Sequence, residues 1–170
     1  MKNISFRNDV LPLKNVLYRL ALRITLSREE AEDIVQDTLI KVWNRRDDWQ
    51  DIDSIEAFSL TVCRNLALDK VKKAGADNQP IGDSEAASAD TASDPYERMM
   101  QRDRVEQVRR IVDSLPEKQK SCMQLRDFEG KSYKEVAAAL GMTEEQVKVN
   151  IFRARQTVKQ KYNEIDKYGL

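Results

Sequence analysis

Residues 132–161, SYKEVAAALGMTEEQVKVNIFRARQTVKQK, predict two short helices joined by a tight turn. Ser132 and Glu135 stand at the spacing of a capping box, in which each side chain binds the other residue's backbone N–H at a helix start. Thr143 and Gln146 repeat this spacing, and the glycine between the two boxes turns the chain easily. Two helices joined in this way form a helix-turn-helix, whose second helix enters the major groove of DNA.

The second of these helices has one apolar face and one basic face. The residues that recur at helical spacing and should face inward are Val147, Ile151, Ala154 and Val158. The cationic and hydrogen-bonding residues on the other side are Lys148, Asn150, Arg153, Arg155, Lys159 and Lys161. Lys and Arg bind phosphates and guanine edges, and Asn binds adenine. We favour DNA binding for this face, and a solvated basic helix is the alternative.

The composition is that of a soluble globular protein, with 41% hydrophobic and 34% charged residues in a chain of 170. We expect a cytoplasmic protein, because no apolar stretch approaches the roughly 18 residues of a membrane span and no signal-peptide pattern opens the chain. Histidine is absent, and two cysteines alone do not close a zinc site. Cys63 and Cys122 are therefore expected to be reduced core thiols, and no metal, cofactor or catalytic site is expected.

The formal net charge of zero hides an uneven distribution of charge. Residues 74–97 contain no Lys or Arg but several Asp and Glu, and they lack apolar periodicity. Such a composition predicts a flexible acidic linker. We therefore predict an all-α fold of two small helical domains, residues 1–75 and 101–170, joined by a linker at residues 76–100.

The first domain is predicted to contain three or four helices, and apolar spacing places three of them at about residues 10–24, 27–44 and 54–73. Ser27 and Glu30 form another capping-box spacing at the start of the second helix. The polar loop at residues 45–53 contains Trp49, which we expect to anchor it.

The second helix carries a polar face opposite its apolar stripe, made of Asp33, Gln36, Asp37 and Asn44. Ile40 lies in the middle of this face. An apolar residue among acids and amides suggests a surface for a partner protein, and an ordinary exposed isoleucine is the equally weighted alternative.

The third helix has a mixed stripe that ends in basic residues, made of Phe58, Thr61, Asn65, Asp69 and Lys72. An aromatic ring among polar and cationic groups suits an unstacked base, for which stacking is worth roughly 1–3 kcal/mol. From the residues alone, a core phenylalanine with a solvated polar edge is the favoured interpretation.

Four segments together resemble one known family. They are AEDIVQDTLIKVW (31–43), RNLALDKVKK (64–73), DSLPEKQK (113–120) and the helix-turn-helix. In this order and spacing they resemble the extracytoplasmic-function (ECF) class of bacterial sigma factors, the promoter-specificity subunits of RNA polymerase. The resemblance covers about residues 10–162.

The resemblance implies roles for three sets of residues. The set that would dock on the β′ clamp helices of core polymerase is Asp33, Gln36, Asp37 and Ile40. The set that would bind and open the −10 element, with Asn65 in the pocket for a flipped base, is Phe58, Thr61, Arg64, Asn65, Lys72 and Lys73. The set that would read the −35 element is Thr143, Gln146, Lys148, Val149, Asn150, Phe152, Arg153 and Arg155.

The chain departs from the family pattern at two places. Family members often carry Trp-Leu-Tyr-Arg where this chain has Phe58–Thr61, which bears on strand melting and on the pocket for the flipped base. They often carry Arg-Ser-Arg where this chain has Lys148–Asn150, which bears on the −35 sequence that is read.

The resemblance also implies the partners: core polymerase through its β′ clamp helices and β flap, promoter DNA, and an anti-sigma factor. It implies a monomer when free, without membrane insertion. The linker resembles a segment that threads toward the polymerase active-site cleft, and a simple tether is the alternative.

The competing functions are a stand-alone helix-turn-helix regulator and a helical adaptor protein. An enzyme is least favoured because no nucleophile–base pair or phosphate loop is present.

Overall fold

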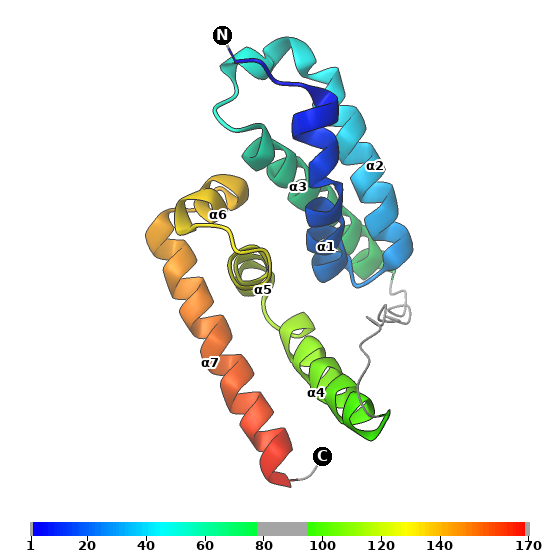
Figure 1. The fold of residues 1–170 in the computed structure, drawn as a ribbon, viewed down its shortest axis with the longest axis vertical. Helices are drawn as coiled ribbons and strands as arrows, with labels where there is room; N and C mark the ends of the chain where they lie inside the picture. Colours follow the sequence, from blue (N-terminus) through cyan, green and yellow to red (C-terminus); the bar gives the residue numbers. More distant parts are fainter. Residues whose placement is uncertain (1, 78–94, 169–170) are drawn as a thin grey trace.

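The computed structural model describes residues 2–77 and 95–168, and within these ranges all regular structure is helical (Figure 1). The α-helices are α1 (Lys14–Thr25), α2 (Arg28–Asn44), α3 (Ile55–Asp77), α4 (Pro95–Asp113), α5 (Glu117–Met123), α6 (Tyr133–Leu140) and α7 (Glu144–Tyr168). Shorter π and 3₁₀ segments are Phe6–Val10, Leu11–Leu13, Arg46–Asp51 and Gln124–Phe128. The all-α prediction is confirmed. Among these helices, none combines the length and the apolar character that crossing a membrane requires.

The first domain is a bundle in which α1, α2 and α3 each pack against the other two. Its centre contains fully buried apolar side chains, among them Leu17, Leu20, Ile34 and Leu60. The predicted first helix starts later than expected, because the chain first forms the π segment Phe6–Val10 and a 3₁₀ turn with a proline in its first positions. Proline is tolerated there since that N–H would have no intrahelical partner.

Helix α2 ends at the predicted residue, but only half of its predicted capping box forms. The Ser27 side chain accepts a hydrogen bond from the Glu30 backbone N–H at 3.3 Å. The Glu30 carboxylate instead lies 3.1 Å from Lys70 Nζ on α3. The Glu30 side chain therefore joins α2 to α3 through an ion pair and does not complete the capping box.

Trp49 anchors the loop between α2 and α3, as predicted. Its side chain is buried, and its indole Nε1 donates to the Val42 backbone oxygen at 3.0 Å. Its ring meets Trp43 edge to face, with centroids 6.2 Å apart, and Trp43 meets Phe6 in the same manner at 5.3 Å. The N-terminal segment, the end of α2 and the loop therefore share one aromatic cluster.

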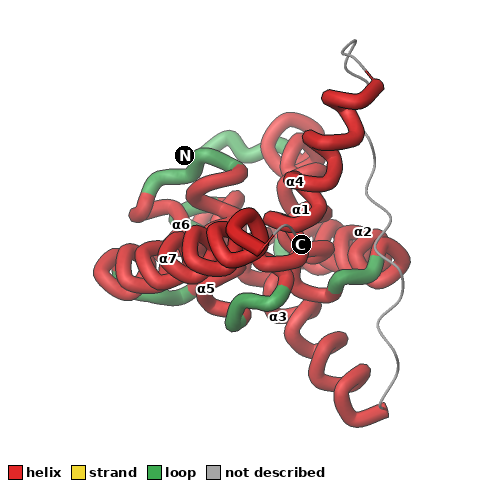
Figure 2. The backbone as a smooth tube through the Cα atoms, turned by 90° about the horizontal axis from the view of Figure 1, so that it is seen from below, coloured by secondary structure: helices red, strands yellow, loops and turns green. Residues whose placement is uncertain are grey.

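The second domain contains the predicted helix-turn-helix, formed by α6 and α7. Both capping boxes are present, with Ser132 and Glu135 bound reciprocally at 3.0 and 3.1 Å and Thr143 and Gln146 at the same distances. Gly141 ends α6 with a φ of 65°, the left-handed conformation that glycine adopts most easily. Helix α7 also lies alongside α5, as the view in Figure 2 shows.

Helix α4 begins at Pro95, inside the stretch that we assigned to the linker, so the helical structure resumes before residue 101. Its C-terminal part packs on α7 through a small cluster of Val112, Leu115, Met123 and Ala154. Helix α3 likewise continues to Asp77, past the predicted boundary. Residues 78–94 of the predicted linker lie outside the described residues.

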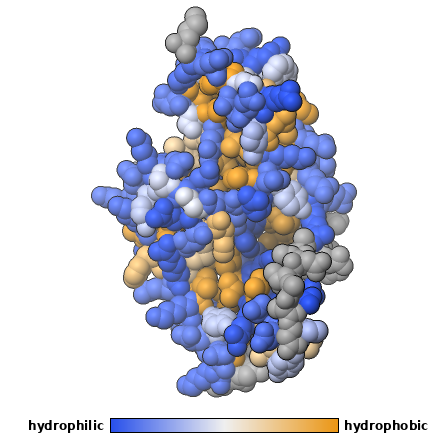
Figure 3. Space-filling model, viewed as in Figure 1, coloured by the Kyte–Doolittle hydropathy of each residue, from blue (hydrophilic) through white to orange (hydrophobic). Residues whose placement is uncertain are grey.

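The two domains are packed against each other. Helix α6 lies on α3, and α5 lies on α1 (Figure 1). One apolar cluster includes Leu60 and Cys63 of the first domain together with Val136, Ala139 and Leu140 of the second. Hydrophobic residues reach the surface along the middle of the molecule, between largely hydrophilic regions (Figure 3).

Candidate functional site

The predicted partner-binding face of α2 lies on the outside of the bundle. All four of its residues are exposed, namely Asp33, Gln36, Asp37 and Ile40. They are spaced three and four residues apart, which places them on one ridge of the helix. The Ile40 side chain is 56% exposed. The opposite side of α2 is buried, so a rigid helix presents this ridge to solvent.

A cation from α3 borders the α2 ridge. Lys70 pairs with Glu30, and this hydrogen bond, together with the charges of Glu30, Asp33 and Asp37, raises the pKa of Lys70 above its usual value. Sequence reasoning missed Lys70 because its proximity to α2 follows from helix packing and not from spacing along one helix. The acidic ridge therefore has one positive charge at its edge.

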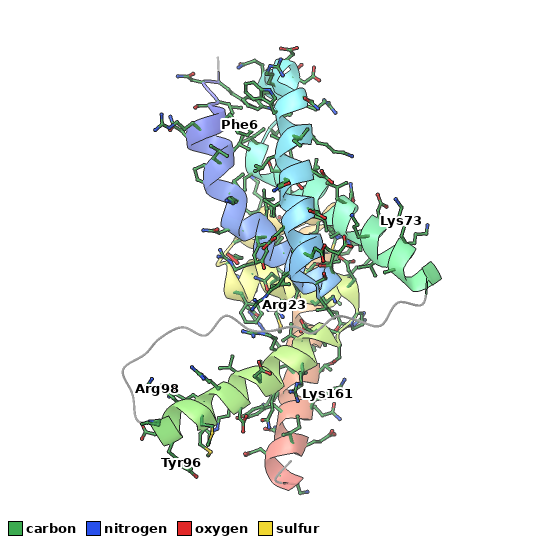
Figure 4. All side chains as sticks on the ribbon, turned by 90° about the vertical axis from the view of Figure 1, so that its right-hand side faces the viewer. Phe6, Arg23, Lys73, Tyr96, Arg98 and Lys161 are labelled. Atoms are coloured by element: carbon green, nitrogen blue, oxygen red, sulfur yellow. The ribbon has the colours of Figure 1, made fainter. Side chains whose placement is uncertain are left out.

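Half of the predicted −10 set is open to solvent. Asn65, Lys72 and Lys73 are exposed. Figure 4 shows Lys73 on the part of α3 that extends beyond the bundle. Phe58 is half-buried against the aromatic cluster, and the Arg45 guanidinium lies 5.6 Å from its ring centroid. This placement agrees with the interpretation favoured from the residues alone, a core phenylalanine beside a solvated polar edge.

The other two members of the −10 set face the second domain. The Thr61 hydroxyl lies 2.7 Å from the Ala139 backbone oxygen and 2.8 Å from that of Ala57. Arg64 binds both carboxylate oxygens of Glu117 at 2.8 and 2.9 Å, and its third nitrogen donates to the Leu140 backbone oxygen at 3.0 Å. In this arrangement neither side chain is free to contact DNA.

The Arg64–Glu117 pair is only 14% and 24% exposed. Burial disfavours the charged carboxylate of Glu117, but hydrogen bonds from Arg64 and Ser121 outweigh it, so the pKa of Glu117 lies below its usual value. The hydrogen bond to Glu117 raises the pKa of Arg64. Both groups are therefore charged at neutral pH, and the pair is an ionic one.

Helix α7, the second helix of the helix-turn-helix, presents its predicted basic face outward. The exposed members of the predicted −35 set are Thr143, Gln146, Lys148, Val149, Phe152, Arg153 and Arg155, and Asn150 is half-buried. Thr143 and Gln146 bind each other at the helix start. Arg155 pairs with Asp127, and Lys148 lies over the Tyr133 ring at 5.4 Å. Phe152 and Arg153 are consecutive exposed residues of α7.

Both cysteines are buried and are free thiols. Burial raises the pKa of Cys63 to about 12 and that of Cys122 to about 11. Across the described ranges, no three His, Cys, Asp or Glu side chains gather as metal ligands would.

Ion pairs between the domains were not predicted from the sequence. Arg23 binds Asp113 at 2.8 Å and Gln124 at 2.9 Å, at the point where α1 meets the second domain (Figure 4). Arg19 binds Glu129 through two nitrogens, both at 2.6 Å. These partners are about a hundred residues apart in sequence, and a single sequence contains no periodic signal for such a contact.

Comparison with known proteins gives two family matches that leave out the segment between the domains. Residues 10–76 match the family described as Sigma-70 region 2, and residues 105–158 match Sigma-70, region 4. The ECF RNA polymerase sigma factor SigE of Mycolicibacterium smegmatis is 31% identical over 84% of this chain, which spans 56% of that relative. SigL of Mycobacterium tuberculosis is 30% identical, with 82% of this chain and 78% of the relative covered.

Two solved structures share the fold. The sigma factor RpoE of Bartonella quintana, in complex with the anti-sigma factor NepR, is 23% identical with a TM-score of 0.76, covering 93% of this chain and 96% of that one. CnrH, in complex with the cytosolic domain of CnrY, is 20% identical with a TM-score of 0.65, covering 91% and 85%. Both sigma-70 regions, in the predicted order, and the relative from M. tuberculosis establish the family: the chain belongs to the ECF sigma factors of RNA polymerase.

Proposed function

We propose that this chain binds core RNA polymerase through the α2 ridge and directs it to promoters. The observation that carries this proposal is the ridge of Asp33, Gln36, Asp37 and Ile40, which is contiguous, exposed and supported from behind by a buried helix face. An apolar centre with a polar rim is the composition that protein interfaces favour. We assign the β′ clamp helices as its partner, and the second domain as the part that meets the β flap.

Promoter DNA is the second proposed partner. The exposed face of α7 would read the −35 element, with Arg153 on base edges and Lys148 and Lys159 on phosphates. Asn65, Lys72 and Lys73 would contact the −10 element. The chain would then carry out no bond chemistry; it would act as a non-enzymatic initiation subunit, in the bacterial cytoplasm where core polymerase acts.

An anti-sigma factor is a third proposed partner, and the free chain is proposed to be a monomer. Support comes from the structurally similar RpoE, which was crystallised with the anti-sigma factor NepR. A stand-alone regulator is less favoured, because it would give the α2 ridge no role.

The test is binding to purified core polymerase. We expect Ile40→Asp to weaken binding by at least about tenfold, or about 1.4 kcal/mol, because it places a charge at the apolar centre of the ridge. Arg28→Ala is the matched control, since Arg28 is exposed on α2 but lies off the ridge. Circular dichroism checks that both variants fold. Unchanged affinity of Ile40→Asp would refute the ridge as the docking face.

A further inference from the structure

The centre of the exposed face of α7 is apolar. Val149 and Phe152, the apolar pair, are three residues apart and therefore neighbours on the helix surface. Their side chains are 46% and 62% exposed. Glu145 and Gln156, which are also exposed, continue this row by one turn at either end. These four residues form the central row of α7, and none of them is a cation.

Cations border the central row on both sides. On one side the exposed residues, seven and four positions apart, are Lys148, Arg155 and Lys159. On the other side is Arg153, which follows Val149 by one turn. A helix in the major groove has base edges below its centre and phosphates along its borders. Glu145 supports this placement of the row, because phosphates would repel its carboxylate.

Several polar side chains of the same face are already bound within the chain. Asn150 Nδ2 donates to the Gln146 backbone oxygen at 2.8 Å. Thr143 and Gln146 bind each other at the start of the helix, and Asp127 holds Arg155. Each of these groups must exchange a hydrogen bond before it can read a base. The apolar pair has no hydrogen bond to exchange.

The apolar group that a base edge presents in the major groove is the C5-methyl group of thymine. We propose that Val149 and Phe152 recognise thymine methyl groups in the −35 element. This inference rests on the proposed function, because it takes the outer face of α7 as the DNA-reading face. Val149 also stands where family members often carry serine. A serine hydroxyl can donate to a base or a phosphate, and valine can do neither.

The charge around the apolar pair favours DNA over a protein as its occupant. A stable protein interface buries about 800 Å² on each partner. Here two apolar side chains stand between cations that suit a polyanion. A duplex can cover the pair and meet these cations in one docking event.

The test uses the full chain assembled with core polymerase. A pool of random duplexes is selected for binding, and footprinting locates the −35 contact on the selected duplex. This duplex is then remade with deoxyuridine in place of one thymine at a time, which removes a methyl group and keeps the hydrogen-bonding edge. We expect one or two of these exchanges in the −35 contact to weaken binding, each by about fourfold, the factor that burial of one methyl group supplies.

Variants at the apolar pair assign the effect to residues. Val149→Ser should bring the thymine-to-uracil affinity ratio to about one at one position, and Val149→Ile should keep the wild-type ratio there. The matched control is Val105→Ser, since Val105 is 55% exposed on α4, and it should keep every ratio. A merely structural role of Val149 would change the overall affinity and leave this ratio as it is. Circular dichroism checks that the variants fold.

The possible results separate this inference from the proposed function. A pool that yields no enriched sequence would count against promoter recognition itself. An enriched duplex whose −35 contact tolerates uracil at every thymine would overturn thymine recognition alone, and so would wild-type ratios in both Val149→Ser and Phe152→Ser. In those cases the polymerase-binding test with Ile40→Asp would still stand.

Discussion

The indole Nε1 of Trp49 donates to the backbone oxygen of Val42 across 3.0 Å, and this bond fastens the loop after α2 to the helix that it leaves. The same loop leads into α3, so the bond helps to fix where α3 begins.

We expect Trp49→Ala to lower the free energy of unfolding by about 3–5 kcal/mol, because it empties a buried aromatic site. Trp49→Phe should cost less, about 1 kcal/mol for the lost hydrogen bond in addition to the change in packing. Trp43→Phe is the control, since Trp43 is 44% exposed. Urea denaturation of the full chain measures all three, and an equal loss for Trp43→Phe and Trp49→Ala would contradict the anchoring role.

Acid should loosen the contact between the domains through Glu117. Its pKa in the folded chain lies below the ordinary 4.5, so its contribution to stability is complete above pH 4.5 and is lost as the pH falls through the lower, folded value. Glu117→Gln removes the ionising group, and the difference in unfolding free energy between wild type and variant should be constant above pH 4.5 and shrink below it. A difference that is unchanged from pH 6 to pH 3 would show that Glu117 does not carry this dependence.

The thiols should be unreactive in the folded chain. Burial raises the pKa of Cys63 to about 12 and that of Cys122 to about 11, so the reactive thiolate is scarce near neutral pH. We expect a disulfide reagent at pH 8 to modify both cysteines rapidly only in denaturant. Rapid modification of the native chain would mean that the core opens far more often than the packing suggests.

The sequence predicted local features well and contacts between domains poorly. Both capping boxes of the helix-turn-helix were predicted because each depends on residues three positions apart, which one sequence displays directly. Glu30 shows the limit of this approach: its spacing from Ser27 was right, but a lysine on another helix took its carboxylate. Arg64 was predicted to contact DNA, but the structure pairs it with Glu117, 53 residues away, and no periodicity indicates such a pair.

Two cationic residues of α7, Arg153 and Lys159, should differ in their effect on −35 DNA. We expect Arg153→Ala to weaken binding of a −35 duplex by about 1–3 kcal/mol and to relax specificity at one base pair, if it meets a base edge. Lys159→Ala should weaken binding of all sequences alike, as loss of a phosphate contact does. Competition binding with base-substituted duplexes distinguishes the two, and a uniform loss for Arg153→Ala would assign it to phosphate.

Arg155 requires a separate test because Asp127 holds it. The Arg155 Nε lies 3.0 Å from a carboxylate oxygen of Asp127, so DNA must compete with this pair. We expect Asp127→Asn to bind a −35 duplex more tightly than wild type and with a steeper dependence on salt, since one more cation is released to phosphates. Equal salt slopes for the two chains would show that Arg155 does not reach the DNA.

Asn65 is exposed on α3, and its proposed role should appear only when the DNA strands separate. Asn65→Ala should leave binding to core polymerase and closed-complex formation intact, because Asn65 lies on neither the α2 ridge nor α7. It should slow strand opening, since the amide would hold a flipped base through its hydrogen bonds. Permanganate reactivity of the melted thymines, followed over time in polymerase complexes, measures this step. Lys73→Ala is the comparison: loss of an electrostatic contact should weaken complexes in a salt-dependent way. An opening rate for Asn65→Ala equal to that of wild type, at the same promoter occupancy, would remove Asn65 from the pocket.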